Sequence, residues 1–249
     1  GAEMCIRDRV FFCNSGAEAN EGAVKLARKY GRLNRNGAQT VITALNSFHG
    51  RTMGMIAATG QPHYQELFQP IPTGFKHVPY DDLEEIKKAT TDNTVAVMIE
   101  PVQGEGGVNI PSDGYLQGVR DWCDKNNMLL ILDEVQTGLG RLGTLIGYQS
   151  LGVEPDIITL AKGLGGGVPI GAFLAKNSAC AFDPGDHGST FGGNPLTCAA
   201  AHASTKYLIE NDVAQNAAEM GEYLGEGLRK IQSNHEFITC LLYTSDAAD

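Results

Sequence analysis

Two kinds of hydrophobic pattern alternate along the chain. Short runs of apolar and β-branched residues are followed by longer stretches in which apolar residues recur every three or four positions. The short runs predict strands, and because they are apolar throughout, they predict strands that are buried on both faces. Strands that alternate with helices are typical of an α/β fold with a mostly parallel, doubly wound sheet. The predicted strands cover residues 40–45, 94–102, 128–135 and 156–162.

An apolar run near the N-terminus changes at Asn14 into a helical pattern, in the sequence FFCNSGAEANEG. Ser15 and Glu18 fit the S-x-x-E capping box, in which two side chains satisfy backbone N–H groups at a helix start. Gly16 and Ala17 are small and leave the first N–H groups of the helix uncovered, which favours an anion at this point. Two interpretations stay open: a capped helix without a ligand, and an anion-binding helix start.

Two further helical stretches complete the pattern. Residues 114–127 place their apolar side chains on one face, and residues 195–232 are mostly helical and are expected to lead out of the sheet domain. We therefore predict a large domain over residues 10–207 that is incomplete at its N-terminal side. Residues 208–238 are predicted to be the start of a truncated, smaller C-terminal domain.

Both ends of the chain differ from the rest. The sequences MCIRDR near the N-terminus and CLLYTSDAAD at the C-terminus continue neither the periodicity nor the boundaries of the predicted elements. We expect residues 1–9 and 239–249 to be non-native sequence attached to an incomplete gene fragment, and they are excluded from the prediction of the fold.

Composition narrows the class of protein. The chain has 249 residues, 42% of them hydrophobic, and 31 glycines, which suits a globular α/β protein with many tight turns. The net charge is −10 and Lys and Arg form no cluster, which argues against binding to nucleic acids or acidic membranes. The pattern predicts no transmembrane helix or signal peptide, and the six cysteines lack metal-ligand spacing. We expect a cytoplasmic protein with reduced thiols and no metal.

Several chemically active residues lie at the ends of predicted strands. Glu100 lies near the end of the strand at 94–102, and Asp133 and Glu134 end the strand at 128–135. Lys162 ends the next predicted strand. In open α/β sheets, ligands bind at the carboxyl ends of the strands. We therefore expect these side chains and the helix start after Asn14 to face one rim of the sheet.

Lys162 and Asp133 fit the chemistry of one cofactor. A lysine at the end of an apolar strand is partly desolvated, which exposes the neutral amine that a Schiff base requires. Pyridoxal phosphate needs such a lysine, an acid for its ring nitrogen and an anchor for its phosphate, which the helix start can supply. Each residue also has a plain structural alternative: Lys162 can pair with a carboxylate, and Asp133 can cap the following turn. The glycines after Lys162 do not follow G-x-x-x-x-G-K-[ST], so a Walker loop is excluded.

Six ordered motifs carry a resemblance to a known family. They are NSGAEANE, FHGR, EPVQGEGGV, LDEVQTGLGR, AKGLGGGVPIGA and HGSTFGGNP. From residue 10 to about residue 232 the chain is similar to the class III aminotransferases, of the ornithine and acetylornithine type. The resemblance implies a fold-type I transferase in which pyridoxal phosphate lies at the interface of a homodimer.

The resemblance assigns cofactor-binding roles to particular residues. Lys162 would be the Schiff-base lysine and proton shuttle, and Asp133 would hold the pyridine nitrogen. Gln136 would lie near the ring hydroxyl, and Phe48 would stack on the ring. The helix start at residues 15–17 would bind the phosphate through backbone N–H groups. A place in the hydrophobic core is the alternative for Phe48.

Further roles concern the substrate and the partner subunit. Arg51 would clamp the substrate α-carboxylate with its planar fork, although it can also pair with a surface carboxylate. Glu105 would lie on the substrate side and mask a second arginine, expected in the C-terminal domain. Ser189 and Thr190 would reach into the partner's site, Thr190 to the phosphate and Ser189 nearer the substrate. His49 is expected to be a packing or hydrogen-bonding residue without a catalytic role.

The resemblance also implies an activity. An amino donor would give up its amine and leave as an aldehyde, after which 2-oxoglutarate would accept the amino group and leave as glutamate. The implied donor is N2-acetylornithine, reacting at its terminal amine to give N-acetylglutamate semialdehyde, in arginine biosynthesis. Alternatives are ornithine, N-succinyl-diaminopimelate or 4-aminobutyrate as donor, an aminomutase, and a non-enzymatic or inactive truncated fragment. Because members of the family are longer, we expect the 249-residue chain itself to be weakly active or insoluble.

Overall fold

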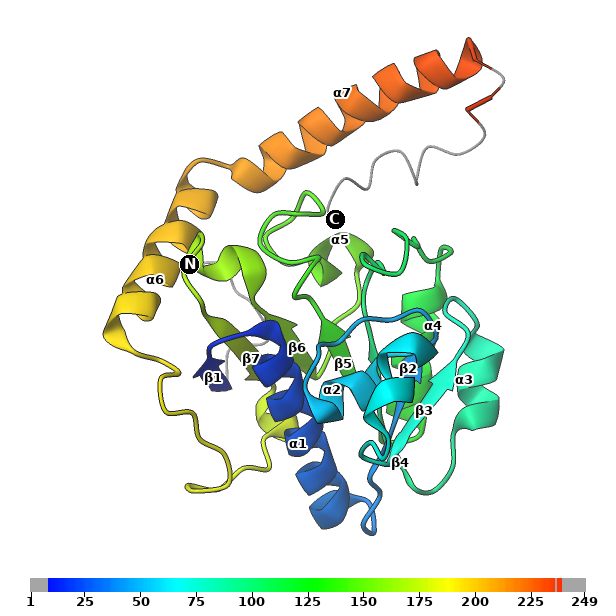
Figure 1. The fold of residues 1–249 in the computed structure, drawn as a ribbon, viewed down its shortest axis with the longest axis vertical. Helices are drawn as coiled ribbons and strands as arrows, with labels where there is room; N and C mark the ends of the chain where they lie inside the picture. The colour runs from blue at the N-terminus through cyan, green and yellow to red at the C-terminus, as the bar shows by residue number, and fades with distance from the viewer. Residues whose placement is uncertain (1–8, 236, 239–249) are drawn as a thin grey trace.

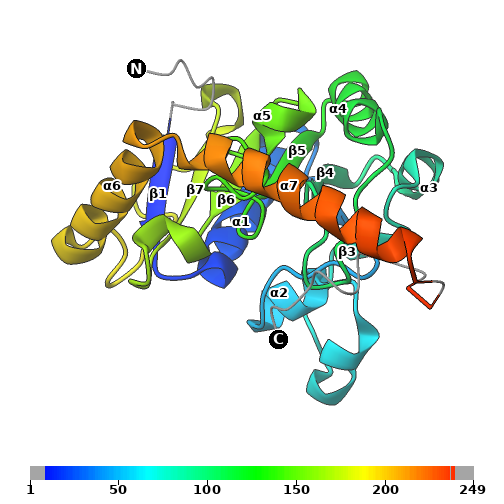
Figure 2. The same ribbon diagram turned by 90° about the horizontal axis from the view of Figure 1, so that it is seen from above.

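A seven-stranded sheet forms the centre of the molecule (Figures 1 and 2). The computed structural model describes residues 9–235, 237 and 238. The strands lie in the order β1-β7-β6-β5-β4-β2-β3. Their bounds are Arg9–Cys13 for β1, Thr40–Ala44 for β2, Phe75–Val78 for β3, Thr94–Ile99 for β4, Leu129–Asp133 for β5, Ile157–Leu160 for β6 and Gly171–Ala175 for β7.

Of the seven strands in the described part of the chain, only β7 runs in the opposite direction. The strands from β2 to β6 pair in parallel, and β7 pairs antiparallel with both β6 and β1, so β1 runs parallel to the others. Because parallel strands end at the same edge, the carboxyl ends of β1, β4, β5 and β6 share one rim. The predicted α/β fold with a mostly parallel, doubly wound sheet is confirmed.

Helices cover both faces of the sheet. α1 (Gly16–Asn34) and α2 (Met53–Ala58) contribute buried residues to the apolar core on one face. α3 (Leu83–Ala89) and α4 (Tyr115–Lys125) contribute to the core on the opposite face. The predicted helices at the N-terminal junction and at 114–127 are therefore present, each on a different side of the sheet.

The central strand β5 shows why its sequence is apolar at successive positions. Leu129 and Ile131 belong to the core on the α1 side, whereas Leu130 and Leu132 belong to the core on the α4 side. Successive side chains of a strand point to opposite faces, so a strand between two helical layers needs apolar residues on both. All five residues of β5 are buried, including Asp133 at its end.

Two long helices follow the sheet in the C-terminal part. α6 (Pro195–Glu210) begins after Asn194, whose side chain accepts a hydrogen bond from the Thr197 N–H. α7 (Val213–Ser233) follows after a break at residues 211–212 and carries no buried residue. Figures 1 and 2 show α6 beside the β1–β7 side of the sheet and α7 extending across the molecule away from the strands. The helical pattern predicted from residue 195 to 232 is confirmed, with an interruption.

Some short elements were not predicted from the hydrophobic pattern. The strand β3 carries the polar residues Lys76 and His77, and β7 is a five-residue run, GAFLA, directly after a glycine-rich loop, so neither resembles a long apolar run. The other short elements are α5 (Tyr148–Leu151) and the 3₁₀ turns η1 (Pro62–Tyr64), η2 (Glu66–Phe68), η3 (Lys162–Gly165) and η4 (Asn177–Ala179).

The predicted non-native ends fall mostly outside the described residues. Residues 1–8 and 239–249 lie outside them, whereas Arg9 is the first residue of β1 and pairs with Ala175. Among the residues that the structure describes, no helix combines the length and apolar character needed to cross a bilayer.

Candidate active site

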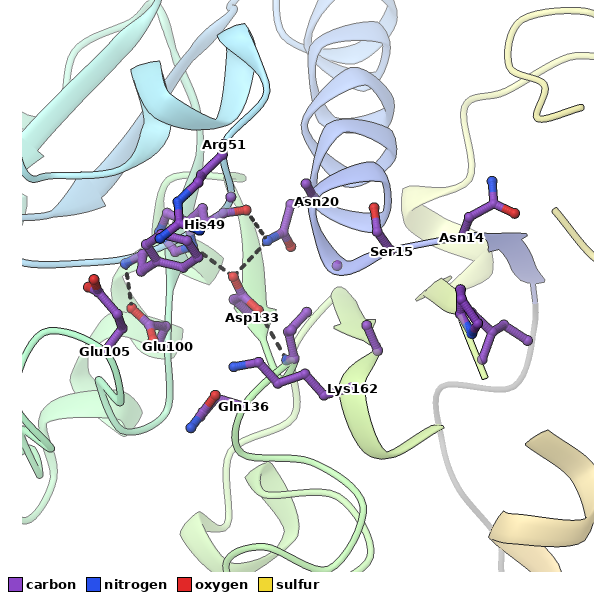
Figure 3. Close-up of a pocket in the computed structure, with 18 of the residues that line it drawn as sticks. Asn14, Ser15, Asn20, His49, Arg51, Glu100, Glu105, Asp133, Gln136 and Lys162 are labelled. Carbon is purple, nitrogen blue, oxygen red and sulfur yellow. Dashed lines mark hydrogen bonds and ion pairs between the residues drawn. The ribbon is translucent and has the colours of Figure 1, made fainter. Parts of the chain in front are cut away.

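A pocket of about 510 Å³ opens at the carboxyl edge of the sheet (Figure 3). Its walls come from the start of α1 and from the segments that follow four strands: 48–51, 100–105, 133–136 and 161–170. These segments are distant in sequence and meet because their strands end at the same rim. Nine of the eleven predicted site residues line the pocket: Ser15, Gly16, Ala17, Phe48, Arg51, Glu105, Asp133, Gln136 and Lys162.

Asp133, the last residue of β5, has a buried and fixed carboxylate. Its Oδ2 accepts a hydrogen bond from Asn20 Nδ2 at 2.7 Å and lies 2.8 Å from His49 Nδ1. Its Oδ1 accepts from the Val135 N–H at 3.1 Å and from the Thr159 hydroxyl at 3.3 Å. The carboxylate therefore caps the following turn, as the structural alternative requires, and also faces a pocket where it can attract a cation.

His49 lies against Asp133 and is fully buried. Burial opposes the charged imidazole, but the hydrogen bond to Asp133 and the negative charges of Asp133 and Glu100 outweigh it, so the pKa of His49 is raised. Its hydrogen-bonding role was predicted; its contact with the site acid was not. Asn20 was also missed as a site residue, although it joins Asp133 to the backbone carbonyl of His49. Both partners are distant in sequence, so local periodicity carries no signal for them.

Glu100 is a second buried acid in the pocket wall. Its carboxylate accepts hydrogen bonds from the Phe48 N–H at 3.0 Å and from the Gly104 N–H at 3.4 Å. Burial raises the pKa of Glu100 to about 7; the neighbouring His49 lowers it and Asp133 raises it further. Glu100 thus connects the segment after β2 with the loop after β4. With a pKa of about 7, its carboxyl group changes its protonation state near neutral pH.

Lys162 lies beyond the end of β6, at the start of η3, rather than within the strand. Its φ of 45° is in the left-handed region, which is uncommon for a residue other than glycine and is often found at functional sites. Burial lowers the pKa of its ammonium, while Asp133 and Glu100 partly oppose this. Within the described chain the Lys162 amine makes no hydrogen bond or ion pair, so it faces the pocket without a carboxylate partner.

The start of α1 presents unpaired donors to the pocket. The Ser15 hydroxyl accepts a hydrogen bond from the Glu18 N–H at 3.2 Å, as the capping box predicts. The return contact differs, because Glu18 accepts at 2.8 Å from the N–H of Asn14, one residue before the cap. The N–H groups of Gly16 and Ala17 have no hydrogen-bond partner in the described residues. Two free donors at a helix N-terminus favour an anion.

Small residues at this junction also serve close packing. A Cβ at Gly16 would lie 2.8 Å from Cγ1 of Val135, and a Cβ at Gly50 would lie 2.7 Å from Cβ of Ala17. Three pocket segments therefore approach one another too closely for larger side chains. The sequence pattern alone attributed the small residues to the anion.

Arg51 and Glu105 lie on the same side of the pocket but do not pair. The Arg51 guanidinium lies 5.4 Å from the ring centroid of Phe48 and 5.6 Å from that of Tyr64. The Glu105 carboxylate accepts hydrogen bonds from the Tyr64 hydroxyl at 2.8 Å and from Gln61 Nε2 at 2.5 Å. Among the described residues Arg51 makes no ion pair, so the alternative pairing with a surface carboxylate is not observed.

The other two predicted site residues lie outside this pocket. Ser189 and Thr190 line a neighbouring pocket of about 370 Å³, which shares Asn14 with the first. The Ser189 hydroxyl accepts a hydrogen bond from Asn14 Nδ2 at 3.1 Å. Their expected contact with a partner subunit stays a prediction.

The pocket combines an amine of lowered pKa, a fixed carboxylate, two free backbone donors and a free guanidinium. The amine can act as a nucleophile or base, and the carboxylate can hold a cationic ring atom. The backbone donors and the guanidinium can each bind an anionic group. This set suits a small anionic cofactor together with a carboxylate-bearing substrate.

Comparison with curated proteins gives consistent relatives. The chain is 58% identical over 226 residues to acetylornithine aminotransferase of Gloeobacter violaceus, which covers 90% of this chain and 56% of that protein. It is 56% identical over 225 residues to the acetylornithine aminotransferase of Methanothermobacter thermautotrophicus, with the same coverage. The chain therefore spans just over half the length of the curated relatives it matches.

Solved structures and family membership agree with these relatives. The ornithine aminotransferase of Toxoplasma gondii is 40% identical, with a TM-score of 0.88 over 92% of this chain and 56% of that one. An omega-transaminase of Thermomicrobium roseum is 35% identical, with a TM-score of 0.87 over 93% of this chain and 58% of that one. Residues 2–241 match the family described as Aminotransferase class-III. From the ordered motifs, the fold and these matches, the chain belongs to the class III aminotransferases.

Proposed function

We propose that the protein to which this chain belongs is a pyridoxal-phosphate-dependent aminotransferase. The observation that carries the proposal is the meeting of Lys162, Asp133 and the free N–H groups of Gly16 and Ala17 at one pocket. Family membership supports the same activity. Bound pyridoxal phosphate would supply an electron sink for the carbon that loses its proton.

The residues present fit this cofactor. The free donors of Gly16 and Ala17 suit a phosphate, and the fixed carboxylate of Asp133 suits a protonated ring nitrogen. Phe48 and Val135 supply apolar pocket surface for a ring, and Gln136 supplies a polar group beside it. The Lys162 amine has no competing partner among the described residues.

The roles of the side chains follow from their positions. Lys162 Nζ is proposed to attach the cofactor and, when neutral, to take up and return the substrate proton, which its lowered pKa favours. Asp133 is proposed to keep a cation in place, with Asn20 and His49 fixing its Oδ2. Arg51 is proposed to bind the substrate carboxylate, because its in-plane donors are free.

The proposed amino donor is N2-acetylornithine, and the proposed acceptor is 2-oxoglutarate. The support is the name shared by the curated relatives that are 48–58% identical. Transfer of the terminal amine would give N-acetylglutamate semialdehyde and glutamate, a step of arginine biosynthesis. Ornithine is the second candidate donor, because the structural relative from Toxoplasma gondii is named for it.

Three further proposals concern the whole protein. A homodimer with shared sites would bring Ser189 and Thr190 to the partner's pocket. A second domain starting near residue 208 is supported by α7, which has no buried residue here. A cytoplasmic location is supported by Cys13, Cys123 and Cys198, whose thiols form no disulfide within the described residues.

The test combines attachment and turnover. The full-length protein that contains this chain is purified, mixed with pyridoxal phosphate, reduced with borohydride and analysed by peptide mass spectrometry, and we expect the adduct on Lys162. Glutamate formation is then measured with acetylornithine, ornithine, N-succinyl-diaminopimelate and 4-aminobutyrate as donors, with acetylornithine expected to have the highest kcat/KM. An adduct on another lysine contradicts the assignment of Lys162. A faster reaction with another donor contradicts the proposed substrate.

A further inference from the structure

Gln61 and Tyr64 contact two pocket residues of opposite charge, Glu105 and Arg51. Glu105 and Arg51 both line it, and an acid and a guanidinium so placed would ordinarily attract each other. Each oxygen of the Glu105 carboxylate instead accepts one hydrogen bond from a neutral group, Oε1 from the Tyr64 hydroxyl and Oε2 from Gln61 Nε2. These bonds satisfy the carboxylate without using the guanidinium.

Tyr64 contacts both charged groups. Its hydroxyl donates to Glu105, and its ring lies against the Arg51 guanidinium, which also lies over Phe48. Aromatic faces hold a guanidinium by cation–π attraction and leave its in-plane N–H donors available. Arg51 is thereby oriented while its fork stays free for a bidentate carboxylate.

The segment that carries Gln61 and Tyr64 is held in place by Ser47, which follows β2. Gln61 Nε2 also donates to the backbone carbonyl of Ser47 at 3.1 Å, and the Ser47 hydroxyl accepts from the Gly60 N–H at 3.0 Å. The Tyr64 ring meets the edge of Phe48 at a centroid distance of 5.7 Å. Ser47 is fully buried, so the segment has a fixed position rather than a loose one.

The loop that carries Glu105 is fixed as well. Gln103 and Asn109 exchange backbone hydrogen bonds across its base at 3.1 and 2.8 Å. The Gly104 N–H donates to Glu100. With both backbones held, the side-chain contacts of Gln61 and Tyr64 determine where the Glu105 carboxylate lies.

We propose that Gln61 and Tyr64 are positioning residues that keep Glu105 from occupying Arg51, so that Arg51 can bind the carboxylate of a dicarboxylic substrate. The inference rests on the proposed function in taking Arg51 as the carboxylate receptor. Without the two donors, Glu105 becomes an intramolecular competitor for Arg51. A tethered group competes at an effective concentration in the millimolar range, which weakens a ligand of similar affinity.

The experiment measures the binding of glutarate to the chain loaded with pyridoxal phosphate, by isothermal titration calorimetry. Glutarate has the carbon chain of 2-oxoglutarate but no carbonyl, so binding is measured without turnover. The double variant Gln61→Ala/Tyr64→Phe keeps the ring beneath Arg51 and removes both donors to Glu105. We expect its Kd for glutarate to rise about tenfold. Tyr30→Phe, on α1 and outside the pocket lining, is the matched control and should bind like the parent protein.

Rescue separates positioning from a structural defect. Adding Glu105→Gln to the double variant removes the competing charge, so the Kd should return to within about twofold of the parent value. An unchanged Kd in the double variant overturns the proposal, and so does a weakened Kd that Glu105→Gln does not restore. Arg51→Lys tests the premise: if it leaves glutarate binding unchanged, the carboxylate role of Arg51 fails, and this inference fails with it. If Arg51→Lys weakens binding but the double variant does not, only this inference fails.

Discussion

Replacing Glu100 with glutamine should flatten the dependence of folding stability on pH. Glu100 is 4% exposed, and burial raises the pKa of its carboxyl group from the ordinary 4.5 to about 7. The folded state therefore holds this proton more tightly than the unfolded state does. Stability from this group is fully present below pH 4.5 and is lost as the pH rises through 7.

The magnitude follows from the size of the pKa change. One pH unit corresponds to about 1.4 kcal/mol, so the rise at Glu100 amounts to about 3 kcal/mol between pH 4.5 and pH 8.5. Glutamine does not ionise, so the free energy of unfolding of the variant should lack this loss. The amide also leaves one backbone N–H, of Phe48 or Gly104, without its acceptor, which costs about 1–3 kcal/mol at every pH and does not change the slope.

Urea denaturation across this pH range measures the effect. The single tryptophan, Trp122, reports unfolding by fluorescence, and circular dichroism provides a second probe. Glu84→Gln, at an exposed position on α3, is the control and should follow the parent protein within about 0.5 kcal/mol. Parallel pH profiles for the parent and Glu100→Gln would refute the reasoning, because they would show that the buried carboxyl titrates as it does in the unfolded chain.

Other substitutions test the site and the packing around it. Lys162→Ala should abolish the borohydride-trapped adduct and glutamate formation, both measured as above. An adduct that persists in this variant would show that another lysine attaches the cofactor. Asp133→Asn should reduce glutamate formation by at least about a hundredfold, because a fixed charge is lost in a shielded site, and stopped-flow measurement of the first half-reaction will show whether the loss is in that step. Gly31→Ala should lower the free energy of unfolding by about 1–3 kcal/mol, since a Cβ there would lie 1.9 Å from the Ala38 carbonyl oxygen. Gly221→Ala, in α7 with open space around it, is the matched substitution and should leave stability equal or raise it by up to about 1 kcal/mol in the same urea assay.

Hydrophobic periodicity was sufficient to predict the strands β2, β4, β5 and β6 and the long helices. β5 and β6 are apolar on both faces because helices cover both faces of the sheet. Successive residues of these strands are therefore apolar, and this can be seen in the sequence. β7 could not be recognised in the same way, because it is short and its Gly and Ala residues continue the composition of the glycine-rich loop before it. Its reversed direction is a property of pairing between distant segments, which no local pattern encodes.

In the candidate site, too, local features could be predicted and contacts between distant segments could not. Lys162, Asp133 and the helix start could be predicted because each follows a recognisable strand, and strand ends converge in this class of fold. The residues that hold these groups in position could not be predicted. Asn20 looks like one more buried residue of α1, and Tyr64 lies in a short 3₁₀ turn without periodicity, yet each contacts a site residue from a distant part of the chain.

The place of β7 in the sheet determines when, during synthesis, the strand before the anion-binding start of α1 can pair. Among the described strands β1 pairs only with β7, and Arg9 is opposite Ala175. After β1 has been synthesised, about 165 more residues must be made before its neighbour β7 is available for pairing. Until then β1, which leads directly into the N-terminus of α1, has no strand to pair with. Binding of a phosphate-bearing ligand to a nascent chain would accordingly begin only after β7 has paired with β1.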